Sequence, residues 1–251
     1  MLKIIQVGHD DASDRYIRNK VKAVEKAGMS ARVINLPFES TTEDVVDRII
    51  VENSLNRDTS AIIVQMPLPP HIDKNAVLGA IAPWYDIDGL NPYSDYKPLT
   101  PCAIMRWLDE QNVELRGKTV VIFGRSELVG KPLANMMIDA GATVTVLNSK
   151  SDEVVAYTST LRANIIVSAV GKVDTIQMKH VPITKHPIII DVGINRDVDG
   201  KLCGDVSDCT RRYTESRGGI CTPVPGGVGK WTVRELVLRL KEMEEKNGGN
   251  I

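Results

Sequence analysis

The sequence predicts an α/β fold made of two α/β domains that flank a cleft. Strand-like and helix-like stretches alternate from one end of the 251-residue chain to the other, as they do in βαβ units. The strand candidates are continuously apolar rather than alternating, which favours parallel strands covered on both faces. At roughly 100–200 residues per domain, the length suits one large or two modest domains.

The composition excludes several classes of protein. Hydrophobic residues make up 43% and charged residues 25%, with a formal net charge of -1, which is typical of a globular protein rather than a disordered or collagen-like chain. A near-neutral charge and only 4% aromatic residues argue against nucleic-acid binding, which uses a basic surface or base-stacking rings. No apolar run approaches the ~20 residues that span a bilayer, so we expect no membrane partner.

The cysteines and the N-terminal sequence indicate the compartment. The four cysteines form no C-x-x-C pair and no metal-ligand spacing with the four histidines, so we expect no metal site and reduced thiols. Met1 leads straight into a strand-like run, with no signal peptide before it. We therefore expect a cytoplasmic protein.

The expected elements divide the chain near residues 108–117. The strands are expected over residues 2–7, 31–36, 61–66, 119–123, 143–147, 164–170 and 188–192, and helices over 11–28, 75–81 and the segments that follow capping-box patterns at 40–43 and 232–235. We predict a first domain over residues 1–110, completed by the C-terminal helix 232–251. The second domain, over 111–231, is predicted to be a Rossmann-type doubly wound parallel sheet.

The segment GRSELVGKP at residues 124–132 predicts a phosphate-binding turn. A strand, a glycine turn and a helix N-terminus together present free N–H groups and a helix dipole to a pyrophosphate. The glycine spacing is not G-x-G-x-x-G, so an ordinary strand–helix turn is the alternative. The next strand ends at Ser149 and Lys150 without the acidic residue that holds the ribose hydroxyls of NAD. With Arg125 nearby, this favours NADP over NAD, unless Lys150 is only a surface lysine.

Polar residues in the first half suggest a second site. Tyr16 and Lys20 are four residues apart, so they project from one helix face. For this pair the alternative is surface decoration. Gln65 ends an apolar strand, unless it is only a polar strand end that faces solvent. Asp86 and Asp88 lie in a turn, for which ordinary Asp-Gly turn chemistry is the alternative. The proline- and glycine-rich loop 222–229 would permit close backbone approach to a ligand, although a linker is the alternative.

Taken together, these segments resemble the methylenetetrahydrofolate dehydrogenase/methenyltetrahydrofolate cyclohydrolase family. The matching stretches are YIRNK at 16–20, VQMPLP at 64–69, DIDG at 86–89, GRS at 124–126, VGKP at 129–132, DVGIN at 191–195, GDV at 204–206 and PVPGGVG at 223–229. Each stretch is weak alone, but they follow the family order across nearly the whole chain.

The resemblance implies NADP-dependent oxidation of methylenetetrahydrofolate and hydrolysis of the methenyl product to formyltetrahydrofolate. It implies that Lys20 is the central catalytic residue, that Tyr16 packs on the folate, that Gln65 tunes Lys20 and that Asp88 anchors the pterin, with Asp86 the less favoured anchor. The implied substrate-binding residues also include Val64, Met66, Pro225, Gly226 and Gly227; the implied NADP-binding residues are Gly124, Arg125, Ser126, Val129, Gly130, Ser149, Lys150, Gly193 and Ile194. It further implies a folate-binding first domain, an NADP-binding second domain, a cytoplasmic homodimer and a role in purine biosynthesis.

The chain also departs from the family pattern. The family usually has a helical segment before the first strand and a longer connection from Asp88 to Pro101. Its Pro-Cys-Thr-Pro stretch is PCAI at 101–104 here, and its Pro-Met-Thr after Gly229 is Lys230-Trp231-Thr232. Two alternatives therefore stay open: an enzyme that retains only one activity, and a non-catalytic folate- or nucleotide-binding protein. A doubly wound dehydrogenase for another small molecule is the remaining alternative.

Overall fold

The structure is a computed structural model that describes residues 1–54 and 58–248. It divides into two compact units: unit 1 comprises Met1–Leu99 with Val233–Ile251, and unit 2 comprises Thr100–Thr232. The chain passes from one unit to the other within two helices, α4 (Leu99–Glu110) and α8 (Val228–Gly248). In the described part of the chain, no helix is long and apolar enough to span a bilayer.

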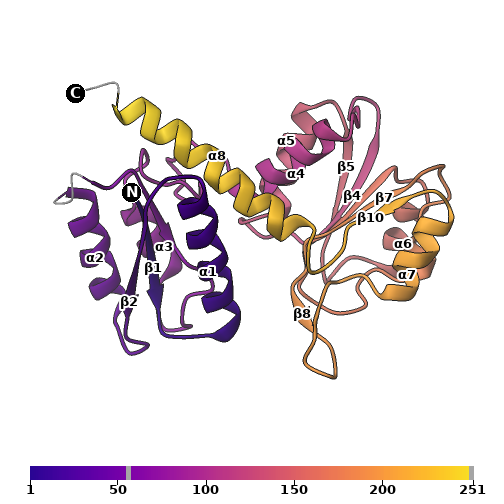
Figure 1. Ribbon diagram of the computed structural model, residues 1–251. Helices are drawn as coiled ribbons and strands as arrows, with labels where there is room; N and C mark the ends of the chain where they lie inside the picture. The colour runs from indigo at the N-terminus through magenta and orange to yellow at the C-terminus, as the bar shows by residue number, and fades with distance from the viewer. Residues whose placement is uncertain (55–57, 249–251) are drawn as a thin grey trace. The chain divides into compact units, whose positions relative to one another are not determined.

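Unit 1 is built on a parallel three-stranded sheet in the order β2-β1-β3. Its elements are β1 (Leu2–Val7), α1 (Asp11–Lys26), β2 (Ala31–Leu36), α2 (Thr42–Ser54), β3 (Ala61–Val64) and α3 (Lys74–Ala80), and Figure 1 shows the helices around the sheet. Alternate strand residues pack on opposite faces. Leu2, Ile4 and Ile63 pack with residues of α1 and α8, whereas Ile5 and Ile62 pack with residues of α2 and α3.

Unit 2 contains a parallel five-stranded sheet in the order β10-β7-β6-β4-β5. Its remaining elements are β4 (Thr119–Phe123), α5 (Gly130–Asp139), β5 (Thr143–Leu147), α6 (Glu153–Leu161), β6 (Ile165–Ser168), a 3₁₀ turn (Met178–His180), β7 (Ile188–Asp191), the antiparallel pair β8 (Asn195–Arg196) and β9 (Leu202–Cys203), α7 (Asp208–Ser216) and β10 (Ile220–Cys221). From β4 the chain goes to β5 on one side and then to β6 on the other. This reversal defines a doubly wound fold, and it confirms the predicted α/β class and Rossmann-type sheet.

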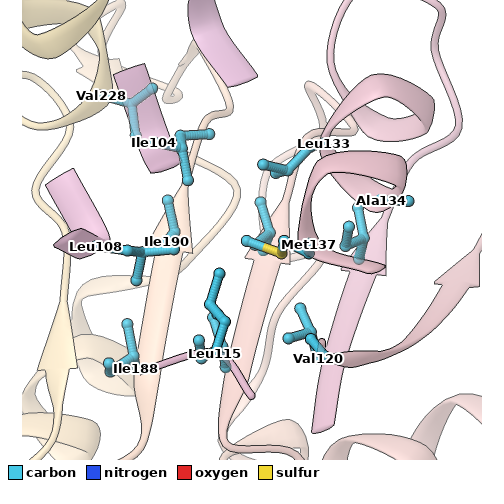
Figure 2. Packing of buried hydrophobic residues seen from close by; sticks show 14 residues of the cluster. Ile104, Leu108, Leu115, Val120, Leu133, Ala134, Met137, Ile188, Ile190 and Val228 are labelled. Atoms are coloured by element: carbon cyan, nitrogen blue, oxygen red, sulfur yellow. The ribbon is translucent and has the colours of Figure 1, made fainter. Parts of the chain in front are cut away.

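The larger hydrophobic core of unit 2 brings together α4, α5 and the sheet. Figure 2 shows Ile104 and Leu108 of α4 with Leu133 and Met137 of α5 and Ile190 of β7. The Trp107 and Trp231 rings stack at the edge of this core, with centroids 4.5 Å apart and planes inclined by 14°. Two of the departures from the family pattern, Ile104 and Trp231, are thus apolar packing residues of unit 2.

Several expected boundaries were wrong. Strand β6 ends at Ser168 rather than at residue 170. Strand β3 ends at Val64, not at residue 66. The first capping box pairs Thr41 with Asp44, because Thr41 N donates to Asp44 Oδ2 (2.8 Å) and Asp44 N to Thr41 Oγ1 (3.2 Å). The expected capping box at Thr232 lies inside α8, which starts at Val228. The Thr232 hydroxyl instead donates to Val228 O (3.1 Å), as interior threonines do.

Candidate functional site

Helix α1 places Tyr16 and Lys20 on one face of unit 1. The helix begins after Asp10, whose carboxylate accepts a hydrogen bond from Ser13 N (2.9 Å) and satisfies a free donor of the first turn. Ile17 and Val24 hold the helix against the sheet. Tyr16 is half-buried, but the Lys20 side chain is only 4% exposed. A buried lysine needs a polar partner, because an unpaired ammonium is costly to remove from water.

Gln65 supplies that partner from the carboxyl end of β3. Lys20 Nζ donates to Gln65 Oε1 at 3.2 Å, and Gln65 Nε2 donates to Met66 O at 2.6 Å. The second bond fixes the amide so that its oxygen faces the amine. Lys20 Nζ also lies 4.8 Å from the centroid of the Tyr16 ring, within cation–π range. The structure therefore brings together three of the four predicted catalytic residues by direct contact.

Burial lowers the pKa of Lys20 below its ordinary value, and the charge of Asp88 partly opposes this effect. A lowered pKa raises the fraction of neutral amine, which can accept a proton from water. The fourth predicted catalytic residue, Asp88, therefore acts on the same amine through its charge. Tyr16, Lys20, Gln65 and Asp88 thus form one cluster in unit 1, bordered by the buried Val64 and by Met66.

The two aspartates of the DIDG turn differ in their surroundings. Asp86 is fully buried, and its carboxylate accepts hydrogen bonds from Gly89 N (3.1 Å) and Asn91 N (2.7 Å). Burial raises the pKa of Asp86, although the Asn91 hydrogen bond lowers it. Asp88 is half-buried. Asp86 therefore holds the turn, and Asp88 is the carboxylate with access to a ligand.

Arg239 stabilises the same turn from α8. Its Nη1 donates to Ile87 O (2.8 Å) and to Lys97 O (2.7 Å), and the side chain is only 6% exposed. Neither Arg239 nor Asn91 was among the predicted site residues. Nothing local in the sequence links residue 239 to residue 87, because the contact depends on the tertiary fold.

In unit 2 the turn between β4 and α5 requires glycine at both ends. Gly124 has φ +108°, and a Cβ there would lie 2.4 Å from Ala169 O. A Cβ on Gly130 would lie 2.1 Å from Gly124 O. The turn is closed by a hydrogen bond from Val129 N to Ser126 Oγ (3.2 Å). Arg125 and Ser126 are exposed at the start of the turn, where a ligand can reach them.

The end of β5 forms a second tight turn. Asn148 Oδ1 accepts a hydrogen bond from Lys150 N, and Ser151 Oγ accepts one from Asn148 N, both at 2.9 Å. The turn leaves Ser149 and Lys150 exposed. Because β5 pairs with β4 in parallel register, this turn and the β4–α5 turn lie at the same edge of the sheet. An exposed hydroxyl and an exposed ammonium at this edge suit a ribose phosphate.

The other predicted residues of unit 2 follow β7 and β10. Gly193 is buried and Ile194 is 60% exposed. Gly227 is also buried, and a Cβ on it would lie 2.6 Å from Pro223 O, so the loop cannot accept a larger residue there without a shift. Pro225, Gly226 and Gly227 thus belong to unit 2, whereas the Lys20 cluster belongs to unit 1.

Two family models match the chain. Residues 1–88 match the catalytic domain of tetrahydrofolate dehydrogenase/cyclohydrolase, and residues 98–247 match its NAD(P)-binding domain. The chain belongs to this family. The prediction from the ordered motifs is confirmed.

Relatives of the tetrahydrofolate dehydrogenase/cyclohydrolase family agree along almost the whole chain. The bifunctional protein FolD of Bordetella petrii is 40% identical over 259 residues, which cover 99% of this chain and 85% of that protein. The bifunctional enzyme FolD of Campylobacter jejuni has a TM-score of 0.89 and 33% identity, covering 98% of this chain and 88% of that one. The Trypanosoma brucei enzyme, complexed with NADP cofactor and inhibitor, has a TM-score of 0.89 and 32% identity, covering 100% and 88%.

Proposed function

We propose that this chain oxidises methylenetetrahydrofolate with NADP and hydrolyses the methenyl product, and that the Lys20 cluster performs the hydrolysis. Its membership of the tetrahydrofolate dehydrogenase/cyclohydrolase family supports both activities. The observation that carries the residue assignment is the buried Lys20 amine, held by Gln65 and next to Tyr16 and Asp88.

In the hydrolysis, water adds to the bridging carbon of the methenyl cation, and a proton must leave the attacking oxygen. The neutral Lys20 amine is the group that accepts this proton. It can return the proton to the folate nitrogen when the carbon–nitrogen bond breaks, while the remaining hydroxyl proton passes to solvent as the formyl carbonyl forms. Gln65 orients the amine through its 3.2 Å hydrogen bond. Tyr16 supplies a ring surface for the folate, and Asp88 supplies an acceptor for the donor groups of the pterin.

NADP would supply the hydride acceptor for the oxidation of the methylene carbon to the methenyl level. The residues of unit 2 that would hold it are those at the carboxyl ends of the parallel strands, where ligands bind in open α/β sheets. The β4–α5 turn leads into the N-terminus of α5, whose helix dipole favours the negative charge of the pyrophosphate. The exposed Arg125, Ser149 and Lys150 fit the ribose phosphate.

Separate assays of the two activities test this function. Purified protein is given methylenetetrahydrofolate with NADP or NAD, and the formation and the loss of the methenyl product are followed independently. We expect methenyl formation with NADP to exceed that with NAD, followed by methenyl loss. Formation without loss, or loss without formation, would support an enzyme with one activity. Folate binding without turnover would support a non-catalytic protein, and failure of any folate to bind would contradict the assignment.

We also propose that the chain acts as a cytoplasmic homodimer that supplies formyl groups to purine biosynthesis. The support is the family resemblance in the ordered motifs. Light scattering of the purified protein checks the assembly: a mass of about 27.6 kDa would contradict the dimer, and twice that mass is expected.

A further inference from the structure

Two buried carboxylates at the carboxyl ends of β6 and β7 have no part in the function described so far. Asp191 ends β7, and Asp205 lies between β9 and α7. Both residues are 0% exposed. Buried carboxylates are stable only when donors satisfy them, and here backbone N–H groups are the main donors.

Asp205 holds the loop that follows β6. Its Oδ2 accepts hydrogen bonds from Val170 N (3.0 Å) and Gly171 N (3.3 Å), and its Oδ1 accepts one from Lys172 N (2.9 Å). Successive backbone N–H groups that converge in this way form an anion-binding nest. Gly171 has φ +72°, as the left-handed residue of a nest requires. The side chain of Asp205 is the anion that fills this nest.

Side-chain donors complete the coordination of Asp205. Ser168 Oγ, at the end of β6, donates to Oδ2 (2.7 Å), and Asn195 Nδ2 donates to Oδ1 (2.9 Å). The carboxylate therefore ties the end of β6 and the loop 170–172 to the segment after β7. An amide of the same shape could not do this, because its NH₂ group would face N–H and O–H donors.

Asp191 holds the backbone of Asp205 in turn. Its Oδ1 accepts hydrogen bonds from Gly193 N and Asp205 N, both at 3.0 Å, and its Oδ2 accepts one from Val206 N (2.9 Å). Burial raises the pKa of Asp191 to about 6, with the charge of Asp205 adding to the rise and the backbone hydrogen bonds opposing it. The two carboxylates are thus held near each other by the donors around them, despite their repulsion.

Glycines allow this close packing. A Cβ on Gly193 would lie 2.0 Å from Asp205 Oδ1, and a Cβ on Gly204 would lie 2.0 Å from Asp191 Oδ2. The two segments that the network fixes each contain an exposed apolar side chain: Val170 is 46% exposed and Ile194 is 60% exposed. Exposed apolar side chains at the ligand-binding edge of an α/β sheet suit the flat face of an aromatic ring.

The strand order assigns a ligand half to this region. A dinucleotide binds across the point where the strand order reverses, which here lies between β4 and β6. The ribose next to the adenine is read at the end of the strand equivalent to β5. The nicotinamide half therefore falls on the side of β6 and β7, where the Asp205 network lies.

We propose that Asp205 is a positioning residue for the nicotinamide half of NADP, acting through the loop 170–172 and the segment that contains Ile194. This inference rests on the proposed NADP-dependent function. Asp205 touches the backbone of the loops and not the cofactor. Its removal is expected to disturb one half of the cofactor site and leave the other half intact.

The test compares Asp205→Asn with the natural full-length protein and with Asp199→Asn, a matched control at an exposed position of the β8–β9 hairpin. We expect Asp205→Asn to lower kcat/KM for NADP by about 10- to 100-fold, the size of effect produced by small misplacements at a reacting centre. Binding of 2′,5′-ADP, which carries only the adenine half, and hydrolysis of methenyltetrahydrofolate should stay within twofold of the natural protein. Asp199→Asn should leave all three quantities unchanged.

The possible outcomes separate this inference from the proposed function. If the natural protein does not bind NADP, the proposed function fails. If it binds NADP and Asp205→Asn reduces NADP as well as the natural protein does, the positioning role is refuted. If Asp205→Asn weakened the binding of NADP and of 2′,5′-ADP equally, the role of Asp205 would be merely structural and the inference would also be overturned. If Asp205→Asn does not fold, Asn195→Ala removes one donor of the network instead. This variant should bind NADP more weakly and 2′,5′-ADP as tightly as the natural protein does. If both ligands bind as they do to the natural protein, the proposal is refuted.

Discussion

Replacing Lys20 by methionine is expected to slow methenyltetrahydrofolate hydrolysis by about 10²- to 10⁴-fold, the usual contribution of a general acid–base group. Methionine retains the length and apolar stem of lysine but cannot accept a proton from water. NADP binding should be unchanged, because the predicted NADP-binding residues belong to unit 2. The decay of methenyl absorbance gives the hydrolysis rate, and a separate titration gives NADP affinity.

The matched control for this substitution is Lys22→Met on the same helix. Lys22 is exposed, whereas Lys20 is 4% exposed, so Lys22→Met should hydrolyse the methenyl compound at the natural rate. Hydrolysis by Lys20→Met at the natural rate would rule out Lys20 as the proton acceptor. In the natural protein, the rate should fall as the pH drops through the lowered pKa of Lys20, because the amine then becomes protonated.

The stabilities of the natural protein and of Lys20→Met test the lowered pKa of Lys20. Burial lowers the pKa of Lys20 in the folded state, so between that pKa and the unfolded value near 10.5 the unfolded chain binds more protons. The free energy of unfolding of the natural protein should therefore rise with pH across this window, relative to that of Lys20→Met. Denaturant unfolding of both proteins at several pH values measures the difference, and a difference independent of pH would contradict the lowered pKa.

Replacing Gly130 by alanine is expected to weaken the use of NADP and to destabilise unit 2. The added methyl group would lie 2.1 Å from Gly124 O, so the backbone of the β4–α5 turn must move. Overpacking of this kind costs about 1–3 kcal/mol. Displacement of the turn that we propose to hold the pyrophosphate should lower kcat/KM for NADP by about 10²-fold. Initial rates at varied NADP concentration and thermal unfolding check the two effects.

Gly79→Ala is the control for a glycine-to-alanine change in a helix. Gly79 lies in α3, where an added Cβ would meet nothing within 4 Å. Alanine should stabilise that helix by about 0.5–1 kcal/mol and leave NADP kinetics unchanged. Methenyl hydrolysis should survive in Gly130→Ala at temperatures below its unfolding, because the Lys20 cluster lies in unit 1. If Gly130→Ala used NADP like the natural protein, the turn would not be the pyrophosphate site.

The parts of the fold that the sequence predicted are those with strong local signals. The runs of β-branched and apolar residues at β1, β2, β4 and β5 predicted the observed strand bounds, because β-branched residues are enriched in strands. Helix α7 was missed because its sequence DCTRRYTES is polar and buries only Thr210 and Thr214. The start of α8 was misplaced because a capping-box pattern at Thr232 also fits a helix interior.

The residues of the candidate site also fall into those that local sequence signals predicted and those that only the tertiary fold brings together. The spacing of Tyr16 and Lys20 and the position of Gln65 at a strand end could be interpreted without coordinates, and the contacts among these residues agree with that interpretation. Arg239 could not be found from the sequence, because it follows Ile87, whose carbonyl oxygen it binds, by 152 positions. The Asp205 network was visible only as the separate DVGIN and GDV motifs, since most of the donors that join them are backbone groups, which leave no mark in the sequence.

The interrupted course of unit 1 has a consequence during protein synthesis. Leu236, Leu240 and Met243 of α8 belong to the same hydrophobic cluster as β1 and α1, yet the ribosome makes them only after all of unit 2. The nascent chain must therefore leave part of this cluster uncovered until α8 has been made. A chain that stalled before residue 236 would display an unfinished core, the kind of surface that recruits chaperones or leads to aggregation.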